Sequence, residues 1–260
     1  MNPYIISIST IFIYMCLWFG IAHIKKNNGL VDIAWGLGFV IVTLVLLSTF
    51  WSESLRQMLI TGMIFLWGIR LSGYLFLRNW GKPEDWRYAN WRKDWTEKGI
   101  YYPRTFFQIF MLQGSIMFLI LLPVIRTVAF ENVNSNNLIW SDFIAILFFL
   151  IGFCFEAIGD YQLYKFKSDP SNKGKLMTAG LWRYTRHPNY FGEALLWWGI
   201  FILSIPAGNI LLSLISPILI TFLLLKVSGV VMLEKKLNLK PDFVEYKRRT
   251  NAFLPWFPRE

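Results

Sequence analysis

The sequence is poor in cysteine, with only Cys16 and Cys154 in 260 residues. Both fall inside apolar runs, so we expect reduced thiols in the core of the protein. Two isolated cysteines exclude a disulfide framework, and with two histidines in the whole chain they leave no metal-ligand spacing. We therefore expect no metal centre.

Charged residues are also scarce, at 16% of the chain against 55% hydrophobic residues, and the mean hydropathy is +0.43. This composition excludes an ordinary soluble domain and favours a single membrane domain over 1–260. We predict an all-α integral membrane bundle of about seven transmembrane helices, with six or eight crossings as alternatives. Seven apolar runs approach the roughly 20 residues that cross a bilayer, namely 3–24, 30–50, 57–77, 106–129, 142–164, 189–205 and 209–233.

Acidic residues number 16 against 26 basic residues, and the basic ones are unevenly placed. Alternate connections, after the first, third, fifth and seventh runs, hold 22 of the 26. Because positive loops stay on the cytoplasmic side, this predicts an outside N-terminus and a cytoplasmic C-terminus. Topology then explains the basic charge, and we expect no nucleic acid partner. Residues 1–22 contain no Lys or Arg, so we expect the first span to be retained rather than cleaved as a signal peptide.

A few ionisable residues lie inside the apolar runs, where a charge costs about 2.5 to 3.5 kcal/mol on insertion scales. All of them fall in the half nearest the basic connections, which predicts one polar cavity open to the cytoplasm. The structural alternative is a set of interhelical pairs that hold the bundle together, with Lys226 extending its amine to the interface. The residues are Asp32, Arg70, Glu156, Asp160, Glu193 and Lys226.

Residues three or four apart share a helix face, and three polar faces emerge in this way. They are Trp67, Arg70, Tyr74 and Arg78; Glu156, Asp160, Tyr164 and Lys167; and Asn189, Glu193 and Trp197.

The stretch GLWRYTRHPNYFGE, residues 180–193, is the richest in chemistry. Pro188 suits the first turn of a helix, which predicts that the sixth span begins at 187–189. Free N–H groups at that terminus, with Arg183, Arg186 and His187 nearby, favour a phosphate-bearing ligand. The alternative is an interfacial helix start whose arginines contact lipid phosphates. No serine elbow, P-loop, zinc motif or complete dinucleotide fingerprint is present.

GLWRYTRHPNYFGE with Trp197 and Trp198, the stretch EAIGDYQ at 156–162 and the tail FVEYKRRTNAFLPW resemble the membrane steroid 5-alpha-reductase-like family. The resemblance is to its bacterial, DUF1295-type members of unassigned substrate, and it is strongest over about 150–260. The Arg186–His187–Pro188 core and the Tyr246–Pro255 tail also resemble the isoprenylcysteine carboxyl methyltransferases.

The reductase resemblance implies a seven-helix bundle that binds NADPH from the cytoplasm and reduces a carbon-carbon double bond conjugated to a carbonyl in a lipidic substrate. In that family a Glu and a Tyr donate to the carbonyl. Here Asp32 and Trp67 stand nearest those positions, and Tyr74 shares the third-span face, so these three are the catalytic candidates. The cofactor-binding candidates are Arg70, Glu156, Asp160, Lys167, Arg186, His187, Asn189, Tyr190, Glu193 and Tyr246.

Three functional hypotheses follow. The first is an NADPH-dependent reductase of a steroid-like or isoprenoid-like enone. The second is an S-adenosylmethionine-dependent membrane methyltransferase, although that group more often carries a pair of acids where Glu234 is followed by Lys235 and Lys236. The third is a lipid-binding or structural membrane protein. For the first we expect a monomer in a bacterial inner membrane, with a lipidic substrate and membrane lipids as partners.

Overall fold

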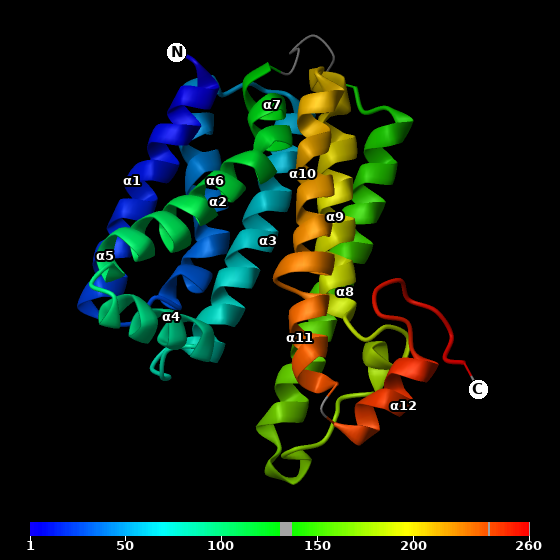
Figure 1. Cartoon of the computed structure of the whole chain (residues 1–260). Coiled ribbons are helices and arrows are strands. Elements are labelled where there is room, and N and C mark those ends of the chain that lie inside the picture. Colours follow the sequence, from blue (N-terminus) through cyan, green and yellow to red (C-terminus); the bar gives the residue numbers. More distant parts are fainter. Residues whose placement is uncertain (131–136, 239, 260) are drawn as a thin grey trace. The chain divides into compact units, whose positions relative to one another are not determined.

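The structure is a computed structural model that describes residues 1–130, 137–238 and 240–259, and these form helices and turns without a strand. Six helices are long and apolar enough to cross a bilayer, or seven if one bent pair counts as a single span. This confirms the predicted all-α membrane protein. The chain divides into two compact units, Met1–Asn137 with Ser204–Ser213, and Leu138–Leu203 with Leu214–Glu260 (Figure 1).

The first unit is built on three long helices, α1 (Pro3–Ile24), α2 (Leu30–Phe50) and α3 (Leu55–Asn79). Helix α2 packs against both others (Figure 1). It approaches α3 closely because Gly36 faces Gly68, and a Cβ on Gly36 would lie 2.5 Å from the Gly68 carbonyl oxygen. A small-residue contact of this kind is a common way for membrane helices to pack.

The predicted span 106–129 is a bent pair. Helix α5 (Tyr101–Arg104), the π-helix η1 (Thr105–Met111) and α6 (Leu112–Ile120) run together, and α7 (Leu122–Phe130) turns from them by 51°. Pro123 lies in the first turn of α7 and has no N–H to donate to the preceding turn, which accounts for a break at this point.

The polar connection 78–105 is folded, as its aromatic content predicts. Helix α4 (Trp86–Glu97) begins where the Asp85 carboxylate accepts a hydrogen bond of 3.0 Å from the Arg87 N–H. Trp91 and Trp95 stack on its surface with ring centroids 5.7 Å apart.

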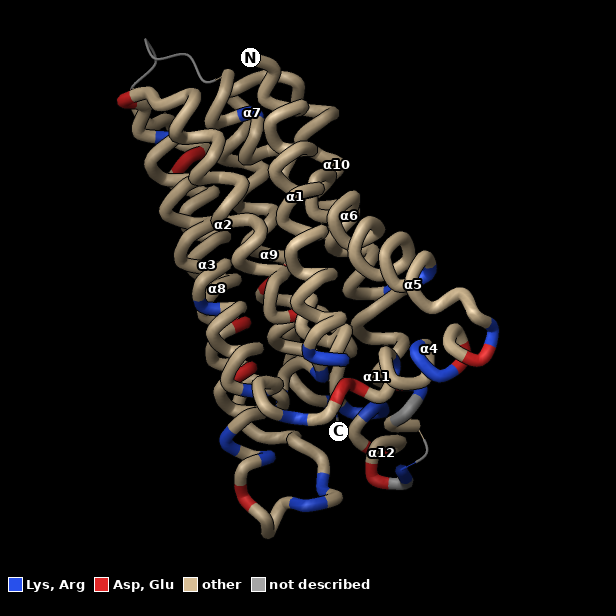
Figure 2. The backbone as a smooth tube through the Cα atoms, turned by 90° about the vertical axis from the view of Figure 1, so that its left-hand side faces the viewer, with Lys and Arg blue, Asp and Glu red and all other residues tan. Residues whose placement is uncertain are grey.

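The second unit contains α8 (Trp140–Ser168), α9 (Pro188–Ser204), most of α10 (Ile210–Phe222), α11 (Val230–Leu237) and α12 (Pro241–Arg249). Short turns η2 (Pro170–Asn172) and η3 (Gly180–Arg183) join α8 to α9, and the π-helix η5 (Leu223–Val227) links α10 to α11. The first unit has the remaining turn, η4 (Ile205–Ala207). Charged residues of the second unit gather where α8 ends and around α12 (Figure 2).

Helices α8 and α9 meet along glycines. A Cβ on Gly152 would lie 2.5 Å from the Leu196 nitrogen and 2.6 Å from the Gly192 carbonyl oxygen, so the two backbones are nearly in contact. Helix α9 begins at Pro188, within the predicted 187–189.

Cys16 and Cys154 are free thiols, as expected. The expectation that both lie in the core is wrong for Cys154, which is exposed on α8, and Cys16 on α1 is only half-buried. A thiol is apolar enough to face a bilayer, so an apolar run alone does not distinguish the buried face of a span from its lipid face.

Candidate functional site

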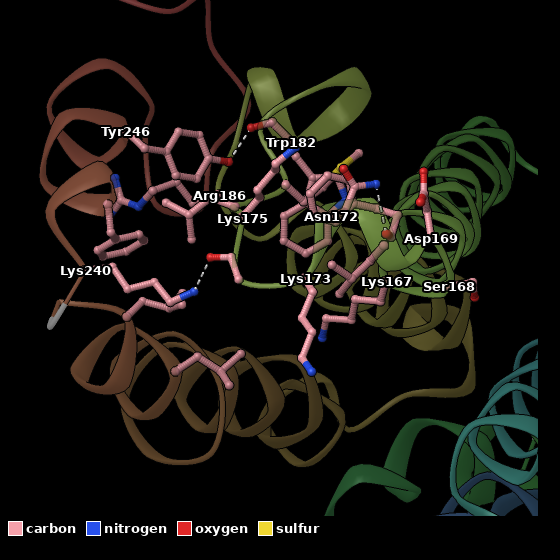
Figure 3. Close-up of a pocket in the computed structure, with 18 of the residues that line it drawn as sticks. Lys167, Ser168, Asp169, Asn172, Lys173, Lys175, Trp182, Arg186, Lys240 and Tyr246 are labelled. Carbon is pink, nitrogen blue, oxygen red and sulfur yellow. Dashed lines mark hydrogen bonds between the residues drawn. The ribbon is translucent and has the colours of Figure 1, made fainter.

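A cavity of about 490 Å³ lies within the second unit, where α8 ends and where α11 and α12 pack (Figure 3). One part of its lining is apolar and includes Phe166, Leu176, Trp182, Leu233, Leu237 and Phe243. The other part is basic, with a single carboxylate from Asp169. The basic lining residues are Lys167, Lys173, Lys175, Arg186, His187 and Lys240.

The segment 180–187 forms one wall of this cavity because it is fixed to α8. The Leu181 N–H donates to the Gln162 side-chain oxygen at 3.0 Å, and the Trp182 indole donates to the Gly159 carbonyl at 3.1 Å. Gly180 has φ +61° and lies against Gln162, a position that only glycine fills without strain. The Gly-Leu-Trp part of the motif therefore positions the residues that follow it.

Arg186 is buried, with 6% of its surface exposed, and its guanidinium binds Glu234 through Nε at 2.8 Å and Nη2 at 2.7 Å. Its Nη1 donates to the carbonyls of Lys247 and Thr250. The sequence predicted that Arg186 would face phosphate, and the residue does line the cavity, but its donors hold Glu234 and the C-terminal tail. A guanidinium with five N–H groups suits such a junction.

His187 and Tyr246 complete this wall. The His187 Nε2 lies 3.2 Å from Glu234 Oε1, and its ring stacks on Tyr190 at 5.4 Å. The Tyr246 hydroxyl donates to the Trp182 carbonyl (Figure 3). Burial raises the pKa of Tyr246, although the Arg186 charge opposes this, so the hydroxyl stays protonated and keeps donating at neutral pH.

A second polar group lies between α8 and α9. The Asn189 side-chain amide donates to Asp160 at 3.1 Å, and the Asn189 side-chain oxygen is buried with no hydrogen-bond partner among the described residues. Glu156 is buried one turn before Asp160 on α8. Asp160 and Asn189, predicted from separate helix faces, are thus brought together. Glu193 is half-buried on α9, and Lys226 is exposed on η5.

In the first unit, Asp32 lies at the start of α2 and is held by α4. The Tyr88 hydroxyl donates to it at 2.8 Å, and an Arg87 nitrogen lies 3.6 Å away. Burial of Tyr88 raises its pKa, and the Asp32 charge raises it further. Asp32 also lines a small polar cavity of about 140 Å³ with Asn79, Lys82 and Asp85.

The third-span candidates differ in burial. Trp67 is fully buried and meets Phe39 edge to face at 5.1 Å in the contact between α2 and α3. Arg70 and Tyr74 are half-buried further along α3, and Arg78 lies over the Tyr74 ring at 5.5 Å.

Three sets of residues at these sites were not predicted from the sequence. Glu234 was considered only as a marker of methyltransferases, although the guanidinium of Arg186 in the motif requires an anion nearby. Lys173, Lys175 and Lys240 were counted only as topology signals. Tyr88 carried no signal beyond the aromatic content of its segment, because its partner Asp32 is 56 residues away.

Comparison with known proteins gives the family. The chain is 26% identical over 247 residues to the "Uncharacterized protein C594.04c" of Schizosaccharomyces pombe, with 82% of this chain and 67% of that protein covered. No solved structure matches the chain significantly. Residues 18–250 match the family model described as "Protein of unknown function (DUF1295)", so the chain belongs to the DUF1295 family.

Proposed function

We propose that the protein is a membrane oxidoreductase that binds NADPH in the cavity of the second unit and reduces a carbon-carbon double bond conjugated to a carbonyl in a lipidic substrate. The observation that carries this proposal is the basic cavity, which is lined by four lysines against one carboxylate, while Arg186 and His187 in its wall are paired with Glu234. Four of the ten residues that the resemblance assigns to the cofactor, Lys167, Arg186, His187 and Tyr246, line it.

The cavity suits a polyphosphate ligand with aromatic ends. Its volume lies within the roughly 300–1,000 Å³ of small-molecule sites. Lysine amines are strong partners for phosphate oxygens, and the half-buried Phe166 in the lining offers apolar surface for a flat ring. Asn189, two residues after His187, has a buried acceptor oxygen that an N–H or hydroxyl of the cofactor would satisfy.

When bound, NADPH supplies hydride to the beta carbon of the enone. The residues of the chain then have two tasks. The lysines and His187 bind the cofactor, while the ion pair between Arg186 and Glu234 keeps His187 in position. A donor must also reach the substrate oxygen as negative charge develops there. We assign this task to Asp32 in its protonated form, with the Tyr88 hydroxyl holding its carboxyl in place.

A membrane methyltransferase remains the second candidate, because the Arg186–His187–Pro188 core and the tail that resemble that group contact each other directly. The Arg186 N–H donates to the Asn251 carbonyl at 2.9 Å, and the Thr185 hydroxyl donates to the Phe253 carbonyl at 2.9 Å. S-adenosylmethionine, however, carries a net positive charge, because it has a sulfonium and an ammonium group and one carboxylate. A cavity rich in lysine repels such a cation and attracts the anionic NADPH.

Equilibrium titration of the purified protein in detergent tests the proposal. Trp182 lines the cavity, so NADPH is expected to quench tryptophan fluorescence with saturation. Replacing Lys173 and Lys175 together by Gln is expected to weaken binding about ten-fold, since each exposed charge contact is worth up to about 1 kcal/mol. Replacing Lys25 and Lys26 in the first unit is the control and is expected to leave the affinity unchanged.

Asp160→Ala and Asn189→Ala are also expected to weaken NADPH binding without unfolding the protein. Asp32→Asn is expected to retain binding and to lose turnover. Saturable quenching by S-adenosylmethionine and none by NADPH would transfer the assignment to the methyltransferase, and quenching by neither would remove both.

A further inference from the structure

The C-terminal tail, residues 250–259, is fixed in its backbone and yet exposes large apolar side chains. Leu254, Trp256 and Phe257 are 64%, 68% and 75% exposed. The Trp256 N–H donates to the Tyr184 carbonyl and the Arg259 N–H to the Arg249 carbonyl, each at 2.9 Å. These hydrogen bonds hold the tail on the second unit with its apolar side chains outward, where an external apolar surface would cover them.

The depth of the tail is set by the motif to which it is bound. Tyr184, which holds Trp256 and touches the Phe257 ring at 6.0 Å, lies four residues before Pro188, where the apolar span of α9 begins. The headgroup region adds about 5 to 8 Å on each side of the hydrocarbon core. Trp256 and Phe257 are therefore within reach of this region, where tryptophan and other aromatic rings concentrate in membrane proteins.

The charge beside these side chains matches an anionic lipid surface. Arg183, Arg248, Arg249 and Arg259 are exposed around the tail. Glu245 pairs with Arg248 at 3.2 Å and with Arg249 at 2.7 Å, and it is the acid that balances them. Arginine beside exposed aromatic rings is the composition of segments that lie in a membrane interface.

We propose that the tail lies in the headgroup layer of the leaflet next to the start of α9. Leu254, Trp256 and Phe257 insert into this layer, and the exposed arginines around the tail bind anionic lipid phosphates. Because the tail also carries the carbonyls that Arg186 binds, the bilayer supports one wall of the cavity from outside.

Site-directed spin labelling tests this in the full chain. Cys16→Ser and Cys154→Ala remove the native thiols, and Leu254→Cys or Phe257→Cys carries the label in bilayers that contain phosphatidylcholine and phosphatidylglycerol. Two controls lie in the same unit. Leu147→Cys marks the lipid face of α8, and Ser171→Cys marks water, because the 29 residues of α8 span about 44 Å and must project beyond the bilayer core.

The labels at 254 and 257 are expected to be more accessible to oxygen than to a water-soluble nickel complex, between the values at the two controls. Replacing Arg248, Arg249 and Arg259 by Gln is expected to move both labels toward the water value and to abolish any dependence on phosphatidylglycerol. A water value at 254 and 257 in the unmodified tail would overturn the proposal. Shielding from both reagents would also overturn it, because a protein surface would then cover the tail.

Discussion

The Glu234 carboxylate is shared by Arg186 at 2.7 Å, His187 at 3.2 Å and Lys247 at 4.0 Å. It is buried, while Lys247 is exposed. Arg186 in turn holds the carbonyls of residues 247 and 250. Glu234 therefore joins α11 to the motif before α9, and through Arg186 to the tail after α12.

Glu234→Gln tests this junction. Removing one partner of a buried ion pair leaves the other charge uncompensated, so we expect a loss of about 3 kcal/mol and a Tm lower by about 5–10 °C. Glu245→Gln is the matched control, because Glu245 pairs with Arg248 and Arg249 on the surface, and its Tm is expected to equal that of the unmodified chain. Equal Tm values for both variants would show that the junction does not support the fold.

Tyr246 gives a prediction with a pH dependence. Its pKa is raised by burial above the usual value of about 10, so its contribution to stability is complete below about pH 10 and is lost as pH rises through the folded pKa. Tyr246→Phe removes the bond to the Trp182 carbonyl, at a cost of about 1 kcal/mol. Thermal unfolding is expected to give the same difference between the two proteins at pH 6 and pH 8.5 and a smaller difference at about pH 11; a difference that is unchanged at about pH 11 would contradict the raised pKa.

At the scale of elements, the contact between α8 and α9 determines where Asp160 and Asn189 meet. Gly192 lies against the backbone of Gly152 and Glu156, so neither helix can shift without separating the polar pair. The close approach of the two backbones at Gly152 and Gly192 depends on the absence of a Cβ.

Gly192→Ala is therefore expected to force the helices apart, lowering Tm and weakening NADPH binding together. Gly62→Ala in α3 is the control, because a Cβ there meets nothing within 4 Å. Alanine favours a helix by about 1 kcal/mol over glycine, so the control is expected to be as stable as the unmodified chain or more so. A Gly192→Ala protein with unchanged Tm and affinity would refute this role for the contact.

For the whole molecule, apolar run length predicted the helices well, since 3–24 and 30–50 coincide with α1 and α2. Apolar run length did not predict the bend at Leu121, because hydropathy takes no account of the backbone N–H that Pro123 lacks. In the site, helical spacing placed Asp160 and Asn189 on the polar faces of two separate spans, and the structure joins them. Spacing could not find Glu234 or Tyr88, because their partners lie 47 to 56 residues away in the chain. The predicted orientation in the membrane and the catalytic assignments stay predictions.

The central claim is that the lysines of the second unit surround an anionic dinucleotide. Acylation of lysines read by mass spectrometry, with and without saturating NADPH, measures this residue by residue. We expect NADPH to slow the modification of Lys167, Lys173, Lys175 and Lys240 several-fold and to leave the exposed Lys25 and Lys98 unchanged. Equal rates at all six lysines with and without NADPH would contradict the account.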